Sequence, residues 1–143
     1  MKRRGVFKGA MLAAAGLFSS ARAQAAEGGP MRVVYHLADF EKADFVLHNI
    51  RNHYEAAGGP EKVAIALVVH GPAVRAFARE ASAATSERFA ALLRRGFSPY
   101  ICATALRGQN LEATDLAPGF VVVEAGVVRL AELQRDGYLY LRP

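Results

Sequence analysis

The chain of 143 residues carries 18 basic and 13 acidic side chains, which gives a formal net charge of +5. The whole positive excess lies in residues 1–25, which hold five basic residues and no acidic one. Because basic and acidic side chains are equal in number over the other 118 residues, charge gives no reason to expect nucleic acid or an anionic membrane as a partner. That length suits one domain with one sizeable core.

Residues 1–25 are predicted to be a secretory signal peptide rather than part of the fold. The segment begins MKRRGVFK and continues into an apolar run that is too short to cross a bilayer as a helix. Small residues follow, and cleavage is expected after Ala25. The Arg3-Arg4 pair favours the twin-arginine route over the general secretory route. We therefore expect a periplasmic protein without membrane association once the signal is removed.

The first part of the remaining chain predicts two strands and two helices. Residues 31–37, MRVVYHL, are apolar and β-branched, as is typical of a strand. Asp39 is expected to cap a helix whose apolar residues recur at helical spacing up to Gly58. Residues 62–69, KVAIALVV, form an almost continuous apolar run, which indicates a strand buried on both faces. A short helix is expected over 72–78, because its proline suits a first helical turn.

The second part continues the alternation. A helix capped by Thr85 or Ser86 is expected to end at Gly96. The elements after it are a strand at 98–102, a short helix at 104–109, a strand at 120–124, a helix at 126–134 and a last strand, expected near a sheet edge, at 138–141. Strands that alternate with helices predict an α/β domain with a parallel sheet between helical layers. The domain is expected over residues 31–143, after a linker at 26–30.

Polar side chains stand where the predicted strands end. His36, His70 and Cys102 close the first three strands, and Glu124 closes the fourth. Because parallel strands share one carboxyl edge and neighbours lie about 4.8 Å apart, we expect these side chains to line one cleft. Cys102 is the only cysteine, and an odd cysteine in an exported protein indicates an intermolecular disulfide or a free thiol.

This set of residue types supports several kinds of chemistry. A cysteine at a helix start near a histidine can act as a thiolate, either carrying sulfur as a persulfide or attacking an ester or amide. One cysteine, two histidines and a carboxylate could instead bind zinc or copper. The structural alternative is that Cys102 is a small buried core residue. The chain has no glycine-rich phosphate loop, and no cofactor is expected.

Several segments, taken in order, resemble the DsrE/DsrF-like family. They are VVYHLAD, LHNIRNHYEAAGG, VAIALVVHGPAV, ICATAL and GFVVVEAGVVRLAELQRDGYLYLRP. The chain is similar in particular to small single-domain members that have a Y-H-L start, an H-G-P turn after the second strand and a G-Y-x-Y-x-x-P end. The likeness covers roughly residues 31–143.

The resemblance implies a three-layer α/β/α fold with a five-stranded, mainly parallel sheet, and a homo-oligomer, often a trimer or hexamer. Family members that work in sulfur relay carry a cysteine after the third strand, which accepts sulfur as a persulfide and passes it to a partner. Cys102 falls at that position, and His36 and His70 match histidines of the small members. The chain departs from many relatives at Ala103-Thr104, where they have an asparagine near the second position.

Together these observations predict an exported sulfur-handling protein, at most a sulfurtransferase-like carrier. Cys102 would hold the persulfide, His36 and His70 would tune the thiolate, and Thr104 with the following helix start would donate backbone N–H groups. Its partners would be a donor or acceptor protein or a small sulfur species such as thiosulfate, sulfide or polysulfide. The alternative is a non-catalytic oligomeric binding or assembly module in which the cysteine is buried.

Overall fold

The computed structural model describes residues 29–143, so the predicted signal peptide over 1–25 lies outside the described residues. The strands within this range are β1 (Met31–Leu37), β2 (Val63–Val69), β3 (Ser98–Cys102), β4 (Val121–Val123) and β5 (Leu139–Leu141). The α-helices are α1 (Ala43–Ala57), α2 (Ala83–Arg94), α3 (Ala103–Gly108) and α4 (Gly126–Arg135). Short 3-10 helices span Phe40–Lys42, Gly71–Phe77 and Ala113–Asp115.

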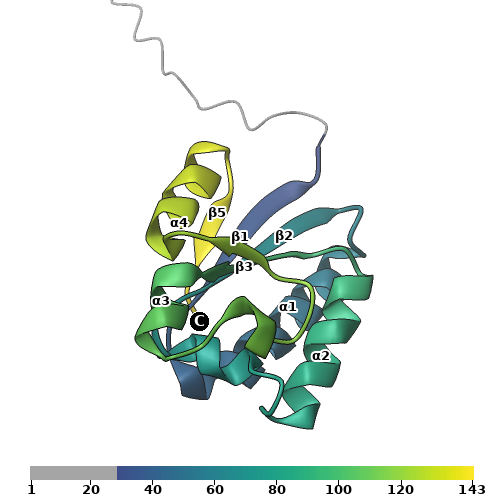
Figure 1. The fold of residues 1–143 in the computed structure, drawn as a ribbon. Coiled ribbons are helices and arrows are strands. Elements are labelled where there is room, and N and C mark those ends of the chain that lie inside the picture. The colour runs from purple at the N-terminus through teal and green to yellow at the C-terminus, as the bar shows by residue number, and fades with distance from the viewer. Residues whose placement is uncertain (1–28) are drawn as a thin grey trace, which may run out of the picture.

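The strands form one sheet in the order β4-β3-β2-β1-β5, and every neighbouring pair is parallel (Figure 1). This confirms the predicted parallel α/β architecture, and β5 lies at an edge as expected. The chain steps outward from β1 to β4 and then returns to the other side of β1. The reversal of strand order therefore falls between β1 and β5, the place where open α/β sheets commonly bind ligands beyond their carboxyl ends.

Helices cover both faces of the sheet, and each face has its own apolar cluster. The larger cluster joins alternate side chains of β1 and β2, including Tyr35 and Leu67, to α1, α2 and the 3-10 segment after β2. The smaller cluster joins the intervening side chains, such as Val34 and Val68, to Leu130 and Leu133 of α4 (Figure 1). Strand β2 is therefore buried on both faces, as its continuous apolar run predicted.

Two predicted helix starts, and the type of one predicted helix, differ from the observed structure. Asp39 makes no side-chain cap bond; one turn of 3-10 helix follows it and α1 begins at Ala43. Helix α2 begins at Ala83 instead of after Thr85, whose buried hydroxyl donates a hydrogen bond to the Asp44 carboxylate 2.9 Å away. The helix expected over 72–78 is a 3-10 helix. In the first two cases a tertiary contact takes the side chain that the local pattern assigned to capping.

Large apolar side chains remain exposed along the two sheet edges and the outer surface of α4. All three residues of β5 are exposed, and the side chains of β4 are exposed or half-buried. The set comprises Val121, Val122, Val127, Val128, Leu139, Tyr140 and Leu141. Within residues 29–143, no helix combines the length and apolar character needed to cross a bilayer.

Candidate functional site

The structure brings His36, His70 and Cys102 to the same face of the sheet, at neighbouring strand ends. His36 is the penultimate residue of β1, His70 directly follows β2, and Cys102 ends β3. Strand register pairs His36 with Val68, so His70 lies two residues further along the adjacent strand and on the same face of the sheet. All three side chains lie on the face that α4 covers, because they alternate with side chains of the larger cluster.

The two histidines contact each other directly. Their ring centroids are 4.5 Å apart, their planes are 18° from parallel, and the two Nε2 atoms are hydrogen-bonded. One of these nitrogens must carry the proton and the other must accept it. The Nδ1 atom of His36 lies 2.6 Å from the Tyr140 hydroxyl of β5. The hydrogen-bonded chain Tyr140–His36–His70 therefore crosses the sheet at the reversal of strand order.

Both imidazoles are held neutral by their surroundings. Burial, above all, lowers the pKa of His36 to about 4, with the charge on His70 adding to the effect. Burial also lowers the pKa of His70. Arg142 lowers both pKa values and Asp39 opposes it; these two residues form an ion pair at 3.7 Å beside the histidines. Near neutral pH both rings are therefore neutral, and their lowered pKa values make them weaker bases than a solvent-exposed histidine.

Cys102 is buried, with 6% of its surface exposed. It is the N-cap of α3, and its Sγ atom accepts a hydrogen bond from the Ala105 N–H at 3.4 Å. The thiol in turn contacts the Glu124 carbonyl oxygen at 3.9 Å. An N–H group directed at sulfur stabilises negative charge there, whereas exclusion of water acts against it.

The Thr104 backbone does not serve the sulfur, contrary to the sequence-based expectation. Its N–H and its hydroxyl both donate to the Glu124 carbonyl, at 3.3 and 2.9 Å, so the amide aimed at sulfur is that of Ala105. The Glu124 side chain, predicted to face the cleft, is exposed and pairs with Arg107 at 2.7 Å. Hydrogen bonding to Glu124 raises the pKa of Arg107, and the nearby Cys102 contributes in the same direction.

Gly126, the first residue of α4, fixes the approach of this helix to the site. A Cβ atom placed there would lie 3.1 Å from the Cβ of His70 and 3.3 Å from the Cβ of Cys102. The two side chains therefore start on opposite sides of one close packing point. A bulkier residue would push α4 away from the histidine and the cysteine.

Sequence reasoning missed Tyr140 and Gly126 as parts of the site. Tyr140 is 104 residues from His36, and only the pairing of β5 with β1 brings the two together. The G-Y-x-Y ending was the one available signal. Within residues 29–143 no group of three or more His, Cys, Asp or Glu side chains is arranged to hold a metal ion, so the zinc or copper alternative finds no ligand cluster.

Comparison with known proteins agrees with this architecture. The sequence profile of the DsrE/DsrF-like family matches residues 33–143. No curated protein matches the chain. Among solved structures, the chain is similar to the protein of unknown function MTH1491 from Methanobacterium thermoautotrophicum, with 28% identity and a TM-score of 0.71 over 79% of this chain and 99% of that one.

Two further structures share the fold. The ychN protein from E. coli is 16% identical with a TM-score of 0.63, over 81% of this chain and 100% of that one. The protein of unknown function BT1422 from Bacteroides thetaiotaomicron is 15% identical with a TM-score of 0.56, over 78% of this chain and 94% of that one. At these identities the likeness concerns the fold alone.

Proposed function

Because the chain belongs to the DsrE/DsrF-like family, we propose that it is an exported sulfur-handling protein in which Cys102 accepts sulfur as a persulfide and passes it on. The observation that carries this proposal is the setting of the thiol. It caps α3, its sulfur accepts a hydrogen bond from the Ala105 N–H, and its Cβ atom lies close to Gly126, as does that of the neutral His70. The N–H group directed at the sulfur is the feature of this setting that a persulfide carrier would use.

The transfer needs no cofactor, because each step exchanges one thiolate for another at a sulfur atom and causes no net oxidation or reduction. The Cys102 thiolate attacks the terminal sulfane sulfur of a polysulfide or an organic persulfide; a new S–S bond forms and the donor leaves as a shorter sulfur anion or thiolate. A thiolate of the acceptor then attacks the outer sulfur of Cys102–S–S⁻. That S–S bond breaks, the sulfur moves to the acceptor, and the Cys102 thiolate is restored.

In this scheme one histidine transfers a proton to and from the Cys102 thiol, and the other holds it in position. His70 takes the proton of the Cys102 thiol when the thiolate forms, and it returns that proton when the site is idle. The lowered pKa of His70 keeps its ring neutral in the resting site, and it also makes the ring a weak base that holds the proton only during the transfer. His36 and Tyr140 act as positioning residues, since their hydrogen bonds to each other and to His70 hold the accepting ring in place.

Access to the buried sulfur requires movement of the segment around Glu124. Beyond the pairing of Val123 with Cys102 at the end of β4, Glu124 itself is held by two hydrogen bonds from Thr104, by the contact of its carbonyl with the Cys102 sulfur, and by an ion pair with Arg107 in which both side chains are largely exposed. Exposed ion pairs hold a segment only weakly. A donor or acceptor protein that engages Glu124 or Arg107 would therefore open the site at little cost.

We extend the proposal to assembly. The exposed valines of β4 and α4 and the exposed side chains of β5 form apolar surfaces of the kind that protein partners cover. A homo-oligomer, a trimer or hexamer, would cover them. The second candidate function, a non-catalytic assembly module with a structural cysteine, is favoured by the 6% exposure of Cys102.

The test is to incubate fully reduced protein with polysulfide and measure its intact mass. A persulfide carrier gains the mass of one or more sulfur atoms, Cys102→Ser gains none, and His70→Gln gains them more slowly than wild type. His48→Gln is the matched control, because His48 is an exposed histidine on the opposite side of the sheet. A thiol that stays unmodified in the folded protein, and reacts only after denaturation, would establish the assembly module instead.

The export proposal has a separate test. Protein recovered from the periplasm should begin at Ala26, whereas a chain that still begins at Met1 would contradict export.

A further inference from the structure

A groove of about 480 Å³ lies between α1 and α2, on the face of the sheet opposite His36 and Cys102. Its floor is apolar, since the buried side chains of Leu47 and Leu92 face it from the two helices. Ala91 lines the α2 side, where its short side chain leaves room. The volume lies within the range of small-molecule pockets, roughly 300–1,000 Å³.

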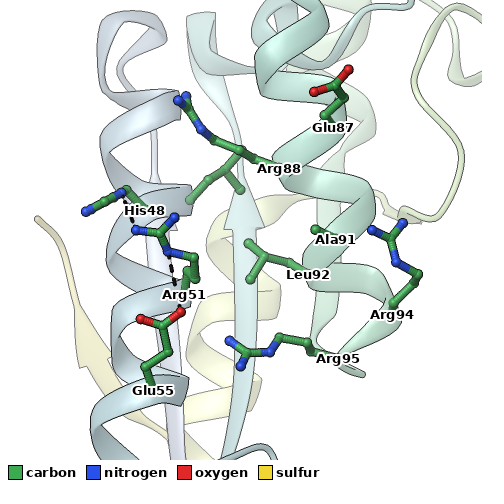
Figure 2. Close-up of a pocket in the computed structure, with 10 residues that line it drawn as sticks. His48, Arg51, Glu55, Glu87, Arg88, Ala91, Leu92, Arg94 and Arg95 are labelled. Atoms are coloured by element: carbon green, nitrogen blue, oxygen red, sulfur yellow. Dashed lines mark hydrogen bonds and ion pairs between the residues drawn. The ribbon is translucent and has the colours of Figure 1, made fainter.

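The rim of the groove is positively charged. Figure 2 shows Arg88 and Arg95 extending from α2 toward α1 on either side of Leu92, with Arg51 on the α1 side. The lining residues include two carboxylates, Glu55 and Glu87, and four arginines, the fourth being Arg94 (Figure 2). Guanidinium groups therefore outnumber carboxylates around the apolar floor.

The arginines differ in how fully they are compensated. Arg88 is matched by Asp44 at 2.9 Å. Arg51 reaches Glu55 at only 3.7 Å, and both side chains are about half exposed, so this pair is weak. Its guanidinium is also hydrogen-bonded to the His48 ring at 3.2 Å and donates to the Asn52 side-chain oxygen at 3.4 Å, both of them neutral partners.

Arg95 is held in place by a ring rather than by a carboxylate. Its guanidinium lies over the Tyr54 ring, 5.5 Å from the centroid, and no carboxylate among residues 29–143 is within ion-pair distance of it. Stacking on an aromatic ring orients a guanidinium and leaves its N–H groups available to an anion. Arg95 and Arg51 thus present donors beside a hydrophobic surface.

From this arrangement we infer that the groove binds a small amphiphilic organic anion, with its apolar body on Leu47 and Leu92 and its acidic head group between Arg95 and Arg51. The charge complementarity excludes a cationic amphiphile of the same size. The site is separate from the sulfur chemistry, because α1 and α2 are on one side of the sheet and the cysteine is on the other. Binding should therefore persist in Cys102→Ser, and the failure of one proposal leaves the other standing.

The test is a titration of the whole protein with decanoate, followed by its amide NMR spectrum. Saturable shifts should be confined to residues of α1 and α2, and decyltrimethylammonium should produce none. Arg95→Glu should weaken decanoate binding roughly tenfold, the effect of losing one charge-assisted contact and adding a repulsive carboxylate. The matched control is Arg135→Glu, an exposed arginine on α4, which should leave the affinity unchanged.

Any of four results would overturn the inference. Shifts that map to β5 and the outer surface of α4 would identify a non-specific apolar patch. Equal binding of the cationic amphiphile, or equal loss in both arginine variants, would remove the role of charge. If decanoate causes no shifts while Arg95→Glu changes the molar mass in light scattering, the groove is a contact between copies of the chain.

Discussion

Acidification should destabilise this protein through His36. The pKa of this buried histidine is lowered from 6.5 to about 4, so the folded state keeps it neutral while the unfolded chain takes up a proton below pH 6.5. The unfolded state then binds more protons, and the free energy of unfolding falls as the pH falls from about 6.5 toward 4. At about 1.4 kcal/mol per pKa unit, the full effect is about 3 kcal/mol, of which about 2.5 kcal/mol is lost by pH 4.5.

The assay is urea unfolding at pH 7 and pH 4.5, at one protein concentration, for wild type, His36→Gln and His48→Gln. The His36 variant should lose less stability between the two pH values than wild type, by about 2 kcal/mol. The His48 variant should follow wild type, since His48 is an exposed side chain of α1. If His36→Gln loses as much stability on acidification as wild type, burial does not hold His36 neutral, and the role proposed for His36 in positioning the His70 ring fails.

Three further outcomes follow from the packing around the site. Gly126→Ala should lower the free energy of unfolding by about 1–3 kcal/mol, because the new Cβ atom would press on two neighbouring Cβ atoms. Gly108→Ala is the control and should be nearly neutral, because a Cβ atom there meets nothing within 4 Å. Equal thermal midpoints for the two variants would contradict the close packing at Gly126. Thr104→Val should speed the labelling of Cys102 by a thiol reagent, as it removes a hydrogen bond to the segment over the sulfur; an unchanged rate would mean that this segment does not limit access. Val128→Lys should reduce the molar mass seen by light scattering while the circular dichroism spectrum stays the same; a wild-type monomer would refute the assembly proposal.

Much of the fold is readable from local patterns. The strand at 31–37 and the strand at 98–102 have the predicted bounds, and the apolar run ending at Val69 is buried on both faces as expected. The predictions for these segments are correct because the pattern of apolar residues along each strand determines which of its side chains are buried. The starts of α1 and α2 were wrong because Asp39 pairs with Arg142 and Thr85 binds Asp44, contacts that no local pattern contains.

The sequence predicted which strand-end residues form the candidate site, but it did not predict the contacts that these residues make. Strand ends alone brought His36, His70 and Cys102 to one edge. That His36 contacts Tyr140 depends on β5 pairing with β1, which sequence order does not reveal. The exposure of Glu124 and the use of its carbonyl by Thr104 depend on the path of one loop, which strand patterning cannot specify.

The central claim is that Cys102 carries sulfur in the cell, and it is tested most directly on protein isolated from its native compartment under conditions that preserve persulfides. The intact mass, together with peptide mapping, should show a fraction of chains with extra sulfur on Cys102 that a reductant removes. A Cys102 found entirely as a free thiol, and unreactive toward polysulfide until the protein is unfolded, would contradict the account and leave the buried cysteine a structural residue.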